Sequence, residues 1–117
     1  MSGFMLLCGH LVGDYLFQND WMALHKRNNS FRCLVHCLLY TFAVWLFTFN
    51  WITIYGIGAC FLTHFLFDRF GLARHYMSLV GQEQFATGPC SPWSIIVVDN
   101  TFHLLTLALI VAATLTN

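Results

Sequence analysis

Apolar residues run through this chain in long stretches that two polar connections interrupt. Residues 33–67 carry no formal charge. As one helix they would extend about 50 Å, against about 30 Å for the hydrocarbon core of a bilayer. Two shorter helices that turn near Phe49-Asn50 fit better. The first stretch, Gly3 to Ala23, and the last, Ser94 to Leu115, are each long enough to cross once.

The pattern therefore predicts an all-α fold, an integral membrane four-helix bundle. It predicts a single domain, 1–117, with spans at about residues 3–24, 32–49, 51–70 and 94–115. The connection 71–93 is the only long one, and Gly88-Pro89 and Ser91-Pro92 interrupt it. Within it, Leu72 to Val80 is expected to form one or two helical turns. We expect this connection to be the most mobile part and to cap the centre of the bundle.

Composition supports a lipid environment. Charged residues make up 9% of the 117 residues and hydrophobic residues 58%, whereas a soluble domain carries about 25% charged residues. The mean hydropathy is +0.66. These values exclude an ordinary cytosolic enzyme, a disordered segment and a nucleic-acid binder, which would need a basic face.

The basic residues predict the topology. All five fall on two connections that, with four spans, lie on the same side of the membrane. The positive-inside rule makes that side cytoplasmic, so both termini are predicted to face outward. These residues are Lys26, Arg27 and Arg32 around the first connection, and Arg69 and Arg74 beside the third.

Acidic and imidazole side chains recur inside the predicted spans at a spacing of four, which places each pair on one helix face. Gln18 continues the first of these faces, and His36 with Tyr40 adds another on the second span. The third and fourth spans run in opposite directions and carry the pair in opposite order, so each Asp lies at the same depth. The pairs are His10/Asp14, His64/Asp68 and Asp99/His103.

Asp and His together suit a divalent metal such as zinc, manganese or iron, and a metal with an open coordination position activates water for hydrolysis. The leading interpretation is a metal-dependent hydrolase acting on a lipid-linked or membrane-proximal substrate. The metal ligands would be drawn from His10, Asp14, His64, Asp68, Asp99 and His103. The catalytic candidates are Asp14, Asp68, Asp99, His36, Tyr40 and Gln18, the last three as orienting groups.

Two alternatives stay open at this stage. The pairs can act as interhelical glue, worth typically about 0.6 kcal/mol per bond, or can pass protons, in a non-enzymatic membrane component such as a phage subunit, channel or host-interaction factor. Cys33-x2-His36-Cys37 offers a second metal-binding pattern. Membrane lipids are the expected partners, together with further copies of the chain as a homo-oligomer, and no nucleic acid is expected.

The joint pattern resembles a family of small multi-pass membrane proteins from bacteria and their phages, domain of unknown function 3307. The resemblance covers nearly the whole chain, and it implies a bacterial or phage protein of the inner (plasma) membrane without supplying an activity. The family typically has Asp-Gln where this chain has Asp99-Asn100. The motifs are His10-Leu-Val-Gly-Asp14-Tyr-Leu-Phe-Gln18, Trp21-Met22-Ala23 with Lys26, His36-Cys-Leu-Leu-Tyr40, His64-Phe-Leu-Phe-Asp68-Arg69, Pro92-Trp93 and Asp99-Asn-Thr-Phe-His103.

Overall fold

A computed structural model describes residues 3–115, and the elements within this range are all helical. The all-α prediction is therefore confirmed for the described residues, which contain no strand. The elements are α1 (Gly3–Leu11), the π-helical turn η1 (Val12–Leu16), α2 (Asp20–Ala23), α3 (Ser30–Thr48), the 3-10 turn η2 (Phe49–Trp51), α4 (Ile54–Phe70), α5 (Leu72–Leu79), α6 (Glu83–Thr87) and α7 (Trp93–Leu115).

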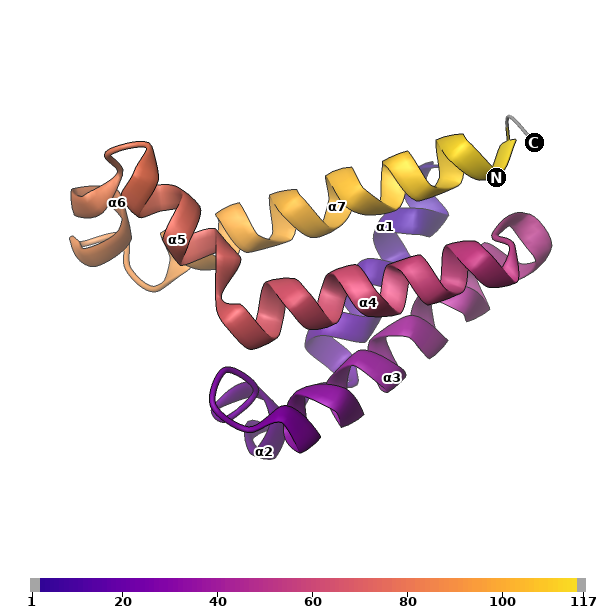
Figure 1. Cartoon of the computed structure of the whole chain (residues 1–117), viewed down its shortest axis with the longest axis horizontal. Helices are drawn as coiled ribbons and strands as arrows, with labels where there is room; N and C mark the ends of the chain where they lie inside the picture. Colours follow the sequence, from indigo (N-terminus) through magenta and orange to yellow (C-terminus); the bar gives the residue numbers. More distant parts are fainter. Residues whose placement is uncertain (1–2, 116–117) are drawn as a thin grey trace.

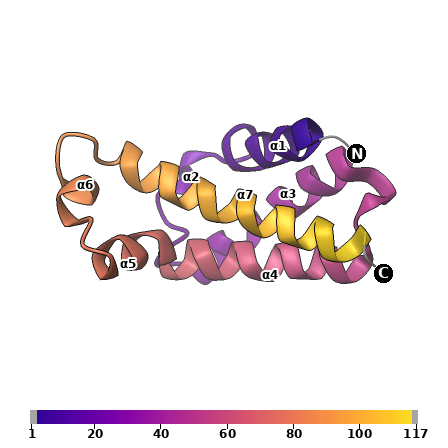
Figure 2. The same cartoon turned by 90° about the horizontal axis from the view of Figure 1, so that it is seen from above.

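Four helical segments lie side by side, and successive segments run in opposite directions (Figure 1). They are α1, α3, α4 and α7. The start of α1, the end of α7 and the turn between α3 and α4 lie at one end of the molecule. The short helices α2, α5 and α6 lie toward the other end, as the view from above also shows (Figure 2). The two basic connections are thus on the same side of the bundle.

Local sequence signals set the ends of the long helices. Asn29 caps α3, because its side-chain oxygen accepts a hydrogen bond from the Arg32 N–H at 3.1 Å. Thr53 caps α4 in the same way through the Gly56 N–H at 3.2 Å. Gly71 ends α4 in the left-handed conformation, with φ of 58°, which glycine adopts without steric cost.

The helix expected over residues 3–24 is interrupted, which corrects the first predicted span. The π-helical turn ends at Leu16, and the Phe17 N–H donates to the Val12 carbonyl at 2.9 Å. Asn19 is extended and caps the separate helix α2 through the Met22 N–H. An Asn side chain that bonds nearby backbone competes with helix continuation, which explains the break.

The helix lengths can be compared with the length that each of the four predicted membrane spans requires. By length and composition, α3 with 19 residues and α7 with 23 are candidate membrane spans. The apolar helix Gly3–Leu16 is shorter than a full crossing. With 17 residues, α4 extends about 25 Å, slightly less than the hydrocarbon thickness.

The connection 71–93 contains more regular structure than expected. Beyond the turns predicted at Leu72 to Val80, it forms α6, and Arg74 of α5 pairs with Glu83 of α6 at 2.5 Å. Ala73 and Met77 are buried, so α5 packs against the bundle through one face. The other face of α5 presents exposed apolar side chains, including Leu79.

The bundle buries a group of polar side chains beside an apolar core, and large apolar side chains are exposed on its exterior. Among its buried residues are four His and two Asp side chains, while many large apolar side chains on α3, α4 and α7 are exposed. In water-soluble proteins, by contrast, exposed apolar patches stay small. The buried His and Asp are His10, Asp14, His36, His64, Asp68 and His103.

Gly9 and Gly13 let α1 and η1 approach α3 closely. A Cβ on Gly9 would lie 3.2 Å from the Val44 Cα, and one on Gly13 would lie 2.7 Å from the ring of Tyr40 and 3.0 Å from its Cα. Small residues four apart are the common means of close helix contact in membranes. This contact brings Asp14 beside α3.

We predict that Gly13→Ala destabilises the fold by about 1–3 kcal/mol, because the new methyl group must displace the backbone of α3. Gly58→Ala is the matched control, since a Cβ at Gly58 meets no atom within 4 Å. The control should leave stability unchanged or raise it by up to about 1 kcal/mol. Denaturant unfolding in detergent, followed by circular dichroism, measures both. Equal stability of the two variants would contradict the close contact.

Candidate metal centre

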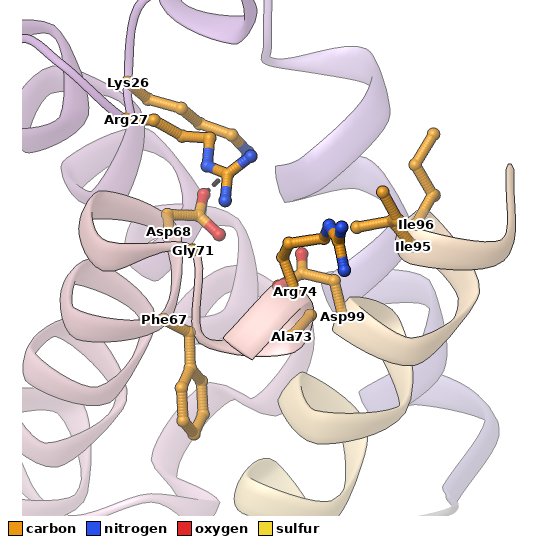
Figure 3. A pocket seen from close by; sticks show the side chains of 10 residues that line it. All are labelled: Lys26, Arg27, Phe67, Asp68, Gly71, Ala73, Arg74, Ile95, Ile96 and Asp99. Carbon is orange, nitrogen blue, oxygen red and sulfur yellow. Dashed lines mark ion pairs between the residues drawn. The ribbon is translucent and has the colours of Figure 1, made fainter. Parts of the chain in front are cut away.

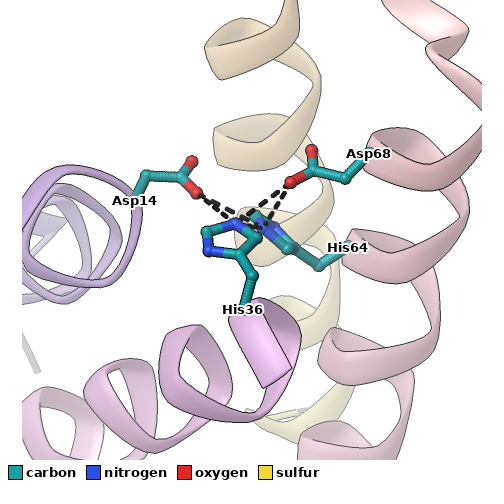
Figure 4. A group of neighbouring side chains, drawn as sticks. All are labelled: Asp14, His36, His64 and Asp68. Atoms are coloured by element: carbon teal, nitrogen blue, oxygen red, sulfur yellow. Dashed lines mark hydrogen bonds and ion pairs between the residues drawn. The ribbon is translucent and has the colours of Figure 1, made fainter. Parts of the chain in front are cut away.

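Three helical segments bring four ionisable side chains to one point in the interior. Asp14 comes from η1, His36 from α3, and His64 with Asp68 from α4 (Figure 4). All four side chains are buried, and one potential ligand atom from each lies within 4.8 Å of every other. The π-helical turn that carries Asp14 is a feature often found at functional sites.

The distances within this group are short and nearly equal. The Nε2 atoms of His36 and His64 lie 3.0 Å apart. Asp14 Oδ1 lies 3.2 Å from His36 Nε2 and 3.3 Å from His64 Nε2. Asp68 Oδ2 lies 3.0 Å and 3.3 Å from the same two nitrogens. Each imidazole nitrogen therefore faces three polar atoms at almost the same distance.

Hydrogen bonding alone does not account for this geometry. A neutral imidazole nitrogen carries at most one hydrogen, so it cannot serve three partners. Within the described part of the chain, Asp14 Oδ1 accepts no well-aligned hydrogen bond, and Asp68 Oδ2 faces the Lys26 ammonium at 2.7 Å. Ligands 2.0 Å from a tetrahedral zinc ion are about 3.3 Å apart. Five of the six separations are 3.0–3.3 Å, close to the edges of such a tetrahedron, and the sixth, between Asp14 and Asp68, is within 4.8 Å. The four atoms are therefore candidates to share one cation.

A second group adjoins the first and shares Asp68. His103 Nε2 lies 3.2 Å from Asp68 Oδ1 and 3.1 Å from Asp99 Oδ2. Asp68 thus directs one oxygen to each group. Asp99 differs from the other carboxylates, because its side chain is 25% exposed whereas that of Asp68 is 1% exposed. The second group offers three ligand atoms and faces outward on one side.

The charge balance of the two groups also favours a divalent cation. Lys26, from the connection before α3, places its Nζ 2.7 Å from Asp68 Oδ2. Burial alone would lower the pKa of Lys26, but the facing carboxylates of Asp68 and Asp14 outweigh burial and raise the pKa above its ordinary value. When the imidazoles are neutral, the ammonium supplies one positive charge against three carboxylates, and two negative charges remain (3 − 1 = 2) that a divalent ion would neutralise. Protonated imidazoles would neutralise the same charges.

His10, predicted as a metal ligand, lies beside the four atoms and outside both groups. Its Nδ1 lies 3.0 Å from the Tyr40 hydroxyl, and its Nε2 lies 3.0 Å from Asn100 Oδ1. Both ring nitrogens are therefore engaged, and Asp14 Oδ2 is 3.6 Å from Nδ1. His10 therefore contacts the surroundings of the cluster and belongs to neither converging group among the described residues. The spacing of four residues correctly places His10 on the same helix face as Asp14. It does not predict which atoms the His10 ring contacts.

Tyr40 and His36 share a helix face but lie differently at the cluster. The Tyr40 ring stacks on His64, with centroids 3.6 Å apart and planes 15° apart, and so supports that imidazole. His36 was expected to orient a substrate, yet its Nε2 is one of the four converging atoms. Nothing in its own span marks it as a ligand, because no Asp lies four residues away.

Two other candidates do not reach the cluster. Gln18 donates from Nε2 to the backbone carbonyl of Asp14 at 3.1 Å, so it holds the end of the π-helical turn. The thiols of Cys33 and Cys37 lie 3.9 Å apart, and the converging groups found among residues 3–115 contain neither. The sequence reasoning did not assign Lys26 to the site, although its charge beside a polar span could have suggested a partner for Asp68.

Comparison with known proteins places the chain in one family. No curated protein and no solved structure matches it. A family model described as a protein of unknown function, DUF3307, matches residues 3–117. Because that match extends over almost the whole chain, the protein belongs to the DUF3307 family.

Proposed function

We propose that this protein is an integral membrane protein that binds a divalent metal ion and uses it for hydrolysis of a lipid-linked or membrane-proximal substrate. One observation carries the proposal: four ligand atoms from three helical segments are separated by distances that suit a common ion. Zinc, manganese and iron accept this combination of imidazole and carboxylate. Asp14, His36, His64 and Asp68 would hold a closed, structural ion, and Asp68, Asp99 and His103 would hold the ion that takes part in hydrolysis.

The buried ionisable side chains and the many exposed apolar side chains support the membrane part of the proposal. An ionised Asp at the centre of a bilayer costs about 2.5–3.5 kcal/mol, so such groups face the bundle interior and pair with one another. Asp14 and Asp68 follow this rule. We propose four passes in a bacterial inner membrane, by α3, α4, α7 and the apolar helix Gly3–Leu16, although this last helix is shorter than a full crossing, with lipids covering the exposed apolar faces.

The two groups suit different tasks. A site with four protein ligands is closed and typical of a structural metal, whereas a hydrolytic site keeps a position open. The group of Asp68, Asp99 and His103 supplies three ligands and is partly exposed at Asp99. A divalent ion held there would supply Lewis-acid chemistry for hydrolysis. The shared carboxylate of Asp68 would couple the closed position to the open one.

We predict that the purified protein contains stoichiometric divalent metal and that Asp68→Asn lowers metal affinity by more than about 100-fold, above the range for residues that only support ligands. The matched control is Asp20→Asn, because Asp20 is an exposed acid on α2, outside both groups. Elemental analysis after equilibration with Mn²⁺ or Zn²⁺ measures the content. Wild-type protein that stays metal-free under these conditions, while folded, would assign the cluster to packing or proton transfer in a non-enzymatic component.

We predict that His10→Gln keeps the full metal stoichiometry and lowers affinity by about 10–100-fold, as expected for a group that orients ligands without binding the ion. His36→Gln, by contrast, should lose the metal, because His36 Nε2 is one of the four converging atoms. Metal titration of the two variants separates the roles. Loss of stoichiometry in His10→Gln would restore His10 as a ligand.

We predict that a reporter fused after Asn117 lies outside the cytoplasm, because the basic connections lie together at the opposite end of the bundle. An alkaline phosphatase fusion should be active and a green fluorescent protein fusion should be dark. The reverse result would overturn the four-pass topology. A reporter fused within residues 26–29, on the basic connection, is the internal control. It should give the opposite result, an inactive alkaline phosphatase and a fluorescent green fluorescent protein.

A further inference from the structure

A pocket of about 180 Å³ borders the open side of the cluster, and basic side chains surround it. Three of the five basic residues in the whole chain line it: Lys26, Arg27 and Arg74. In Figure 3, Lys26 and Arg27 approach from the connection before α3, while Arg74 reaches over from α5. Most of the few Lys and Arg residues in the chain therefore line this one cavity.

The pocket joins this basic rim to the candidate metal ligands. Asp68 and Asp99 line its wall, so the open three-ligand group faces the same space as the guanidinium groups. The two carboxylates are already paired, Asp68 with Lys26 at 2.7 Å and Asp99 with His103 at 3.1 Å. The lining carries three basic side chains against these two carboxylates, a formal excess of one positive charge (3 − 2 = 1), and a divalent ion on the three-ligand group would add two further charges.

Arg27 is the cation best placed to meet a ligand. In the described part of the chain it forms no ion pair, whereas Lys26 pairs with Asp68 and Arg74 with Glu83. Its guanidinium lies directly against Gly71, where a Cβ would overlap it. Its backbone carbonyl accepts a hydrogen bond from Arg69. The guanidinium occupies the space that a side chain at position 71 would fill, and the hydrogen bond from Arg69 fixes the Arg27 backbone. Both contacts keep Arg27 at the rim of the pocket.

We propose that this pocket binds a phosphoryl group, with its oxygens facing the Arg27 guanidinium and the Lys26 ammonium on one side and the open metal position on the other. A tetrahedral dianion offers several oxygens that can meet these groups at once, and guanidinium groups bind phosphate through two parallel hydrogen bonds. A single carboxylate has only two oxygens and one negative charge. The metal contact rests on the proposed function above, whereas the contacts with Arg27 and Lys26 do not.

The remaining wall suits a phosphate carried on an apolar group. Phe67 of α4 and Ile95 with Ile96 of α7 line the same cavity. Beside it, α5 exposes Tyr76 and Leu79, as expected for a helix that lies at a membrane surface. The ligand chemistry is a phosphomonoester or phosphate, whether it belongs to a lipid headgroup or is free in solution.

Equilibrium dialysis of radiolabelled inorganic phosphate against the full chain in detergent, with and without Mn²⁺, tests this. We expect saturable binding that Arg27→Gln weakens by about tenfold or more, the worth of a charged hydrogen bond. Arg27→Lys should recover part of the affinity. The matched control Arg32→Gln removes the same charge from α3, outside the pocket, and should leave binding unchanged.

Competition by dihexanoyl phosphatidic acid, with dihexanoyl glycerol as the phosphate-free control, distinguishes the two sources. Displacement at lower concentration than inorganic phosphate identifies a lipid headgroup, and equal displacement identifies the free anion. Metal content is measured in the same samples. Arg27-dependent binding to metal-free protein would retain the pocket and reject the metal proposal. No saturable binding to the metal-loaded protein, or equal losses in Arg27→Gln and Arg32→Gln, would overturn the phosphate pocket and leave the metal centre standing.

Discussion

The carboxylate of Asp68 is the point on which the structure depends. It is buried in an apolar bundle, and its two oxygens face two different sets of imidazoles while an ammonium group approaches one of them. A buried carboxylate is costly unless it is paired. The constraint fixes the neighbours: α3 must present His36, α7 must present His103, and the connection before α3 must fold back far enough for Lys26 to reach inside.

Close contact between helices is the second requirement, and glycine provides it. Asp14 reaches the centre only because α1 and η1 lie against the backbone of α3, with no side chain at Gly9 or Gly13 to separate them. The helix then ends one turn later, where Asn19 caps a new helix. The first helical segment is therefore short and packs tightly at the site. The break after it lets the chain fold back, so that Lys26 reaches Asp68.

Much of this arrangement follows from spacing. Pairs four residues apart fix a helix face, and opposite order in antiparallel helices fixes a common depth, which is why Asp68 and His103 could be placed together from the sequence. Spacing does not specify rotation about the helix axis. His10 therefore turns toward Tyr40 and Asn100, and His36, with no acid four residues away, takes a converging position. The hydrophobic pattern did not predict the helix break at Asn19, because apolar stretches lie on both sides of it.

The two candidate metal positions differ in the way that separates structural from catalytic chemistry in proteins. The four-atom group is closed and buried, so an ion there would tie η1, α3 and α4 together without meeting a substrate. The three-atom group opens at Asp99 toward a cavity whose rim is basic. Exposed ion pairs contribute little stability, so packing alone gives little reason for Arg27 and Arg74 to lie at the mouth of an acidic cluster in a chain with few charges. The proposed phosphate, bound between these side chains and the proposed metal position, would account for their place.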